Sequence, residues 1–325
     1  MWPTNIFICY NMLSLSRAQG YLGKLTDPTG IIEHARFSRP YLVEGYTTDD
    51  NARAFQVALR SGKGLAKTRQ VSLRFLQSAA TAAGFYNDMN VAGEWIDQPG
   101  TGEWFGRGML AISEGLKLGD QGEKKICHQL WGLAEPVITQ VTSLRADANL
   151  VVAGIKPRVK ILLTALEKNR TADWVWFEPG LYYDNGRLPL ALFAAGRLRE
   201  GRQTLDWLRD VTWNQPRGCF DFVGNAGWWE KGKPKAKFDQ QPVEAGSMVE
   251  ASVAAYTATG DKKYLDMAYA AWEWYFGRNI IGVSLVDPKT GGVRDAIHPH
   301  GCNLNEGAEA VLSFMLAGMA LRGLE

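Results

Sequence analysis

The sequence predicts an all-α protein in which six helical hairpins form a ring, an (α/α)6 toroid. Six short polar clusters each stand directly before a run of apolar, helix-forming residues, and a second helical pattern separates most neighbouring clusters. The repeating unit is therefore a helical hairpin. Patterns typical of strands are few, with short candidates at 174–177 and 282–286. A ring of six hairpins would bring six helix N-termini, and the clusters that precede them, to one cleft.

Hydrophobic periodicity and helix-breaking residues define the individual helices. Gly20 and Gly23 are expected to end the first helix, and Pro157 to divide the segment 148–168. We expect residues 1–24 to form an N-terminal extension and the first outer helix, and residues 25–325 to form a single toroid domain. Helices are predicted over 11–23, 48–61, 66–82, 106–118, 123–143, 148–168, 185–199, 202–213, 241–258, 262–278 and 305–322.

The polar clusters lie at the predicted starts of the inner helices, and the longer loops precede them. Loops of this length in a compact domain are usually functional. Because they all lead into polar clusters, we expect them on one face of the ring. The clusters span residues 47–53, 103–107, 145–149, 183–187, 238–244 and 303–309.

Composition excludes several classes of partner. The hydrophobic fraction is 46% and the charged fraction 22%, as in an ordinary globular protein. A net charge of +2 without a large basic block argues against nucleic acid or an anionic membrane as the main partner. No apolar run approaches the roughly 20 residues of a membrane span. The four cysteines match no metal-ligand spacing, and without an evident secretory signal we expect a cytoplasmic protein. We expect no cofactor.

Aromatic residues are abundant, with 12 Trp, 11 Tyr and 13 Phe, and many lie beside the polar clusters. Aromatic faces flanked by carboxylates suit sugar rings, whose faces are apolar and whose rims carry hydroxyls. A large toroid also needs bulky side chains between its two layers of helices, and either use explains a single Trp equally well. On the first interpretation, Trp104, Trp176 and Tyr183 would contact a substrate.

The first cluster combines helix capping with candidate chemistry. Thr47 and Asp50 fit a capping box, and Asp49 and Asp50 complement the positive end of the helix dipole. Adjacent helical residues point about 100° apart, so one carboxylate can cap while the other faces the cavity as general acid or base. Arg53, one turn after Asp49, is placed to hold a carboxylate ionised.

Ring geometry ranks the carboxylates. Clusters one and four are three steps apart in a six-step ring and hence opposite. With helix axes roughly 8–10 Å apart, opposite carboxylates would approach to roughly 7–9 Å, which leaves room for the water of an inverting glycosidase. Asp50 and Asp184 are therefore the predicted acid/base pair.

Other side chains of the clusters are expected to bind sugar hydroxyls or, in the case of Asp239, Glu244 or Glu306, to supply the second carboxylate instead. Pro242 suits a first helical turn, which makes Asp239 alternatively a cap. His298 and His300 could form half of a metal site, but no third ligand is indicated and we expect no metal. The predicted binding residues are Asp49, Arg53, Trp104, Arg107, Trp176, Glu178, Tyr183, Arg187, Asp239, Gln240, Glu244, His298, Asn305 and Glu306.

Four motifs carry a resemblance to a known family: HARFSRPYLVEGYTTDDNARA, WVWFEPGLYYDNGRLPLAL, GWWEKGKPKAKFDQQPVEA and DAIHPHGCNLNEGAEAVLSF. From Leu25 to the C-terminus the chain resembles a bacterial family of the six-hairpin glycosidase-like superfamily. Members occur alone or associated with glycosyltransferases. The resemblance implies a toroid, carbohydrate chemistry and a functional link to a glycosyltransferase. Asp49-Asp50 is also similar to the catalytic aspartate pair of α-1,6-mannanases, which implies a mannoside as one candidate substrate.

The sequence thus favours an inverting glycoside hydrolase that acts on an oligosaccharide or glycan. One alternative is a sugar epimerase or isomerase that relies on His34 and His298. Another is a non-catalytic glycan-binding accessory of a glycosyltransferase. The chain contains no Gly-rich strand-to-helix turn typical of a nucleotide-sugar transferase.

Overall fold

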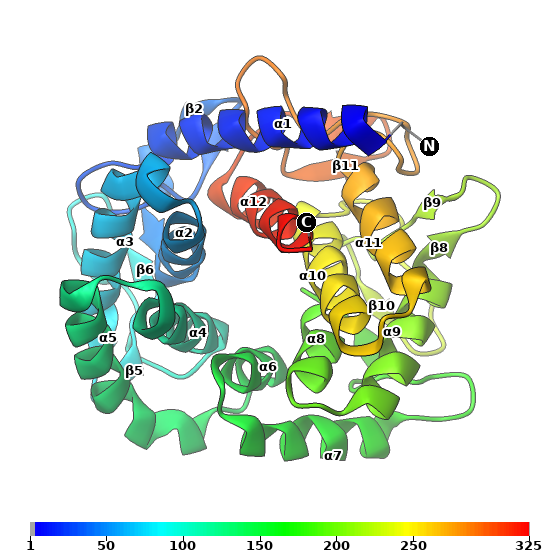
Figure 1. Cartoon of the computed structure of the whole chain (residues 1–325), viewed down its shortest axis with the longest axis horizontal. Helices are drawn as coiled ribbons and strands as arrows, with labels where there is room; N and C mark the ends of the chain where they lie inside the picture. The colour runs from blue at the N-terminus through cyan, green and yellow to red at the C-terminus, as the bar shows by residue number, and fades with distance from the viewer. Residues whose placement is uncertain (1–3, 325) are drawn as a thin grey trace.

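A computed structural model describes residues 4–324 of the chain, with side chains from Leu13 onward, and confirms the (α/α)6 toroid. Six inner helices form a closed ring in which α12 packs against both α10 and α2 (Figure 1). They are α2 (Thr48–Arg60), α4 (Glu103–Leu118), α6 (Leu144–Ala153), α8 (Arg187–Ala194), α10 (Pro242–Thr259) and α12 (Ala308–Arg322). The outer layer contains α1 (Thr4–Leu25), α3 (Ala66–Ala79), α5 (Gln121–Ala134), α7 (Val159–Asn169), α9 (Leu198–Thr212) and α11 (Lys262–Trp274).

Several helix boundaries differ from the prediction for physical reasons. Gly20 and Gly23 do not end α1, because Tyr21, Leu22 and Leu25 beside them are buried and packing outweighs the weak helix propensity of glycine. The predicted helix 123–143 stops at Ala134 and continues as the 3-10 segment η3 (Glu135–Gln140), which contains a proline. Residues 1–3 of the predicted N-terminal extension lie outside the described part of the chain.

The predicted division of 148–168 is confirmed. Helix α6 ends at Ala153, where Gly154 adopts a left-handed conformation with φ 113°. The short 3-10 segment η4 (Lys156–Arg158), which contains Pro157, then leads into α7. Two further 3-10 segments are η1 (Leu42–Glu44) and η2 (Gly62–Leu65).

Short antiparallel strand pairs hold the loops together, but they are not where the sequence predicted them. Residues 174–177 form no strand, and 282–286 contribute only isolated bridges from Ser284 and Val286. The pairs are β1 (Ala35–Arg36) with β2 (Arg39–Pro40), β3 (Tyr46–Thr47) with β6 (Asp88–Met89), β4 (Ala80–Thr81) with β5 (Gly84–Phe85), β7 (Gly180–Leu181) with β10 (Trp229–Glu230), β8 (Trp213–Asn214) with β9 (Cys219–Phe220), and β11 (Ala296–His298) with β12 (Gly301–Asn303).

Glycines in two of the polar clusters allow neighbouring inner helices to approach closely. A Cβ atom on Gly106 would lie 2.5 Å from the Ala146 backbone, and one on Gly186 would lie 2.4 Å from the backbone of Ser247. These contacts join α4 to α6 and the start of α8 to α10 at the end of the ring where the clusters lie. No helix within residues 4–324 is long and apolar enough to span a membrane.

Candidate functional site

The inner helices open into one cleft at their N-terminal ends, with a volume of about 630 Å³. Five of the six polar clusters contribute to its described lining. The third does not, because Arg145 turns instead to the carbonyl of Tyr183 and to Glu178. The polar lining residues are Glu33, His34, Thr47, Asp49, Asp50, Arg53, Asn87, Glu103, Trp104, Tyr183, Asn225, Asp239, Gln241, Asp295, Asn303 and Glu309.

At the start of α2, one of the two hydrogen bonds of the predicted capping box is present. Thr47 Oγ1 accepts a hydrogen bond from the Asp50 backbone N–H at 3.1 Å, but the Asp50 side chain accepts from Arg53 Nη1 at 3.2 Å. Burial raises the pKa of Asp50 to about 8, an effect that Arg53 opposes and that Asp49 and Glu33 reinforce. Burial therefore favours the neutral carboxylic acid form of Asp50, which lines the cleft.

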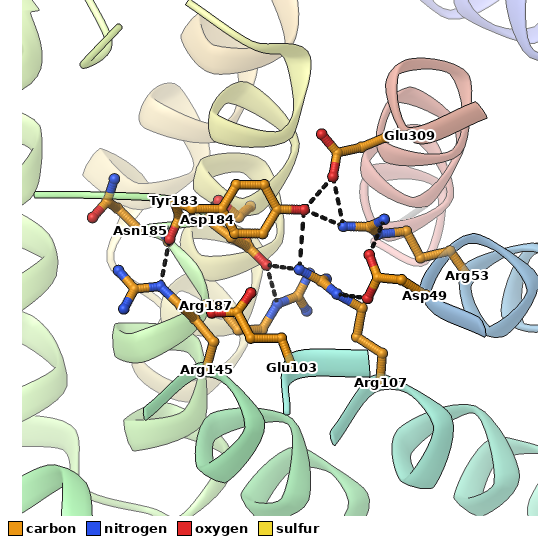
Figure 2. Close-up of polar contacts among 12 residues, drawn as sticks. Asp49, Arg53, Glu103, Arg107, Arg145, Tyr183, Asp184, Asn185, Arg187 and Glu309 are labelled. Atoms are coloured by element: carbon orange, nitrogen blue, oxygen red, sulfur yellow. Dashed lines mark hydrogen bonds and ion pairs between the residues drawn. The ribbon is translucent and has the colours of Figure 1, made fainter. Parts of the chain in front are cut away.

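Below the cleft lies a layer of ion pairs that we call the arginine floor: Arg53, Arg107 and Arg187 with the carboxylates they bind (Figure 2). Arg53 pairs with Asp49 at 2.6 Å and with Glu309 at 3.0 Å. Arg107 pairs through Nε with Asp49 at 2.5 Å. Arg107 Nε and Asp49 Oδ1 are close but have no hydrogen-bond partner, because the N–H does not point at the oxygen. The contact is therefore an ion pair without an aligned hydrogen bond.

Tyr183 connects the floor to the cleft. Its hydroxyl accepts from Arg53 Nη2 at 2.6 Å and from Arg107 Nη2 at 3.3 Å, and it bonds to Glu309 Oε1. Burial raises the pKa of Tyr183 well above its ordinary value, although both arginines oppose the shift. The phenol is thus a neutral donor to Glu309, and clusters one, two, four and six meet at this one hydroxyl (Figure 2).

Asp184, predicted as half of the acid/base pair, is placed elsewhere. Its side chain is fully buried and is absent from the described cleft lining. It accepts from Arg107 Nη2 at 3.1 Å and from Arg187 Nε at 3.5 Å. Burial alone would raise the pKa of Asp184, but Arg187 and Arg107 outweigh it and hold the value at about 2. A permanently ionised, inaccessible carboxylate has the properties of a structural anion and not of a group that exchanges protons with substrate.

Several predicted binding residues also lie away from the cleft. Trp176 is fully buried and packs against Phe177 and Trp207, so the aromatic-core interpretation applies to it. Gln240 is fully buried and donates to Asp221 Oδ1. Glu306 is buried and accepts from Thr290.

Five further predicted residues are also absent from the described lining of the cleft and contact other groups. Glu178 binds Arg145, and Arg187 binds Glu250. Glu244 accepts from Asn185 Nδ2 at 2.9 Å, and burial raises its pKa to about 8. Asn305 Oδ1 accepts from the backbone N–H of Phe37. The His298 side chain is half-exposed, with Nδ1 3.9 Å from Asp239 Oδ1. Predicted residues that do line the cleft are Asp49, Asp50, Arg53, Trp104, Tyr183 and Asp239.

Glu33 is the most informative residue that sequence reasoning missed. It is partly exposed in the cleft, with its Oε1 3.4 Å from His34 Nε2. Burial, together with the charges of Asp88, Glu44 and Asp49, raises the pKa of Glu33 to about 7. Glu33 lies in an irregular segment, so no periodicity pointed to it, and only its position just before the first cluster could have done so.

Three more carboxyl groups complete the cleft: Glu103, Asp295 and Glu309. Burial raises the pKa values of Glu103 and Asp295. The cleft therefore holds seven carboxyl groups and two basic residues, Arg53 and His34. Within the described residues, no group of three His, Cys, Asp or Glu side chains is arranged to hold a metal ion.

Comparison with known proteins identifies the fold. No protein-family model matches the chain, and no curated protein sequence matches it. Among solved structures, it is similar to a D-mannose isomerase (TM-score 0.75, 13% identity, 100% of both chains covered). It is also similar to cellobiose 2-epimerase from Bacillus thermoamylovorans B4167 (0.70, 14%, 96% of this chain and 99% of the other). An unsaturated glucuronyl hydrolase specific for heparin gives 0.62 at 10% identity, over 97% and 96% of the two chains. At such identities the likeness establishes the toroid.

Proposed function

We propose that this protein is a carbohydrate-active enzyme that hydrolyses a glycosidic bond with inversion. The observation that carries the proposal is the set of seven carboxyl groups in one open cleft, including Glu33 with a pKa of about 7. Inverting hydrolysis needs one carboxylic acid that keeps its proton near neutral pH and one carboxylate that activates water. Carboxylates and the Asn side chains of the cleft also suit hydrogen bonds to sugar hydroxyls.

Glu33 is our choice for the general acid. It would donate its proton to the glycosidic oxygen as the bond to the anomeric carbon breaks. Asp239 is our choice for the base, since its carboxylate is partly exposed on a different wall of the cleft and the sequence already marked it as a candidate second carboxylate. Asp239 would take a proton from the water that attacks the opposite face of the sugar. Solvent then returns Glu33 and Asp239 to their starting protonation states.

Two further features support this assignment. Asp239 has a left-handed backbone conformation, with φ 65°, and such conformations gather at functional sites. Asp50, the donor predicted from sequence, stays a second candidate because it lines the cleft and burial favours its neutral form. The charge of Glu33 adds to the rise in the pKa of Asp50.

Epimerisation or isomerisation of a sugar is the second candidate, and the contact between His34 and Glu33 favours it. An imidazole beside a carboxylate can remove a proton from the carbon next to a carbonyl group. The similar structures named for isomerase and epimerase activities add support to this candidate. A non-catalytic glycan-binding role beside a glycosyltransferase stays a prediction from the sequence.

The test is turnover of an oligosaccharide panel, with mannosides and glucosides foremost, by wild type, Glu33→Gln, Asp239→Asn and Asp50→Asn. Release of reducing sugar by wild type, and its loss in Glu33→Gln and Asp239→Asn, is the expected result. Addition of phosphate distinguishes hydrolysis from phosphorolysis. Binding without turnover, equal in all four proteins, would overturn the catalytic proposal in favour of the accessory role.

A further inference from the structure

A second cavity, of about 230 Å³, lies on the far side of the arginine floor from the cleft. Its walls come mostly from the middle and C-terminal parts of the inner helices, and α8 contributes its first residue, Arg187. Arg53 lines both the cleft and this cavity, so the arginine floor separates the two. Its polar lining residues include Arg60, Arg107, Arg187, Asn149, Glu114 and Glu250.

Asn149 lines the cavity without a partner for its side chain. It is 1% exposed, and among the described residues neither Nδ2 nor Oδ1 makes a hydrogen bond. Buried amide groups are nearly always paired, because an unpaired one has lost its hydration without compensation. An unpaired Asn at the wall of a cavity therefore points to a ligand or to ordered water.

The arginines also present unused donors. Arg107 is 3% exposed and Arg187 is buried, yet in the described part of the chain the Nη1 atoms of both make no hydrogen bond. Arg107 makes its aligned hydrogen bonds through Nη2 alone, to Tyr183 and Asp184. Each Nη1 carries two N–H donors, so each arginine keeps at least these two donors for another acceptor.

The carboxylates that line the cavity are already engaged. Both oxygens of Glu114 accept hydrogen bonds, from Gln56 at 2.7 Å and from Arg60 at 2.5 and 3.0 Å. Glu250 Oε2 accepts from Arg187 at 2.8 Å. The unused groups are therefore mainly donors, and cationic side chains outnumber anionic ones among the lining residues. Unused N–H donors favour a ligand that carries acceptor oxygens.

We propose that this cavity binds a small oxyanion, such as phosphate or a carboxylate, through Arg107, Arg187 and Asn149. The planar guanidinium fork matches the paired oxygens of both anions. The bound anion would share Arg107 and Arg187 with Asp184, and so it would strengthen the arginine floor beneath the cleft. The inference does not depend on which reaction the cleft catalyses.

The experiment measures thermal unfolding and calorimetric binding with sodium phosphate and, separately, with sodium acetate, each against sodium chloride at equal ionic strength. Wild type is expected to gain Tm with the oxyanion. Asn149→Asp keeps the size of the side chain and adds a negative charge, so this variant is expected to bind the oxyanion at least about tenfold more weakly. A rise with phosphate alone would assign a phosphate site, and a rise with both would assign a general oxyanion site.

Val253→Phe is the second variant, because it fills the cavity from an apolar wall and leaves every polar group in place. It should abolish the response to oxyanion while it preserves the fold. A response no larger than that to chloride in wild type would overturn the proposal and leave a cavity that holds only water. An equal response in wild type, Asn149→Asp and Val253→Phe would place the anion elsewhere and overturn it as well.

Discussion

Asp49 on α2 and Asp184 at the start of α8, on opposite sides of the inner ring, are joined by a single guanidinium. Arg107 contacts Asp49 Oδ1 through Nε at 2.5 Å and donates to Asp184 Oδ2 through Nη2 at 3.1 Å. Asp184 is thereby held in a buried ion pair, outside the described lining of the cleft that contains Asp50. We therefore place the proposed chemistry among the carboxyl groups of the cleft walls.

Asp184→Asn should destabilise the protein by about 3–5 kcal/mol, because removal of one member of a buried ion pair leaves the other charges without compensation. Asp239→Asn, on a partly exposed side chain, should change the free energy of unfolding by less than about 0.5 kcal/mol. Urea denaturation of both variants measures the difference. A stable but inactive Asp184→Asn would restore Asp184 as a catalytic candidate.

Glu33 predicts the alkaline limb of the pH–rate profile. A general acid must carry its proton, and the pKa of Glu33 is about 7, so kcat/KM should fall as pH rises through about 7. Glu33→Gln should remove most of the activity, and Glu33→Asp should lower the rate and move the alkaline limb to a different pH. An unchanged limb in Glu33→Asp and a shifted one in Asp50→Glu would transfer the role to Asp50.

Glu244 predicts how stability depends on pH. Its folded-state pKa is about 8, above the ordinary 4.5, so between these values the folded protein holds a proton that the unfolded chain has lost. The contribution of Glu244 is fully present below pH 4.5 and is lost as pH rises toward 8. Glu244→Gln should flatten this slope and gain on the order of 1 kcal/mol or more at pH 8. An unchanged slope in Glu244→Gln would show that other groups set it.

Phe37 stores backbone strain at the tip of the β1–β2 hairpin. Its φ is 52°, a left-handed conformation that is unfavourable for a residue with a Cβ atom. Its side chain is 65% exposed, so burial of the ring offsets little of this strain. Phe37→Gly should stabilise the protein by about 1 kcal/mol, since glycine adopts this conformation freely. Phe37→Ala keeps the strain and serves as the control. Equal Tm values for the Gly and Ala variants would argue against strain at this position.

Sequence patterns predicted the ring and the place of the cleft, because helix periodicity and polar residues at helix starts are local features. They did not predict which way each side chain points. Asp184 and Asp50 have the same kind of sequence context, but Arg187, together with Arg107 from a neighbouring part of the ring, makes Asp184 a structural anion. Trp176 stands beside a polar cluster in sequence yet belongs to the aromatic core. Glu33 has no pattern around it, and only tertiary packing brings it into the cleft.

The most direct test of the central claim is proton NMR of an oligosaccharide incubated with the protein in D2O, followed from the first minutes of reaction. Our account predicts a newly released sugar whose anomeric configuration is inverted relative to the bond cleaved. It also predicts no deuterium on the carbon next to the anomeric centre. The signal of the released sugar should be lost when Glu33→Gln replaces the wild type. Deuterium at that carbon without bond cleavage would contradict hydrolysis and establish epimerisation or isomerisation instead.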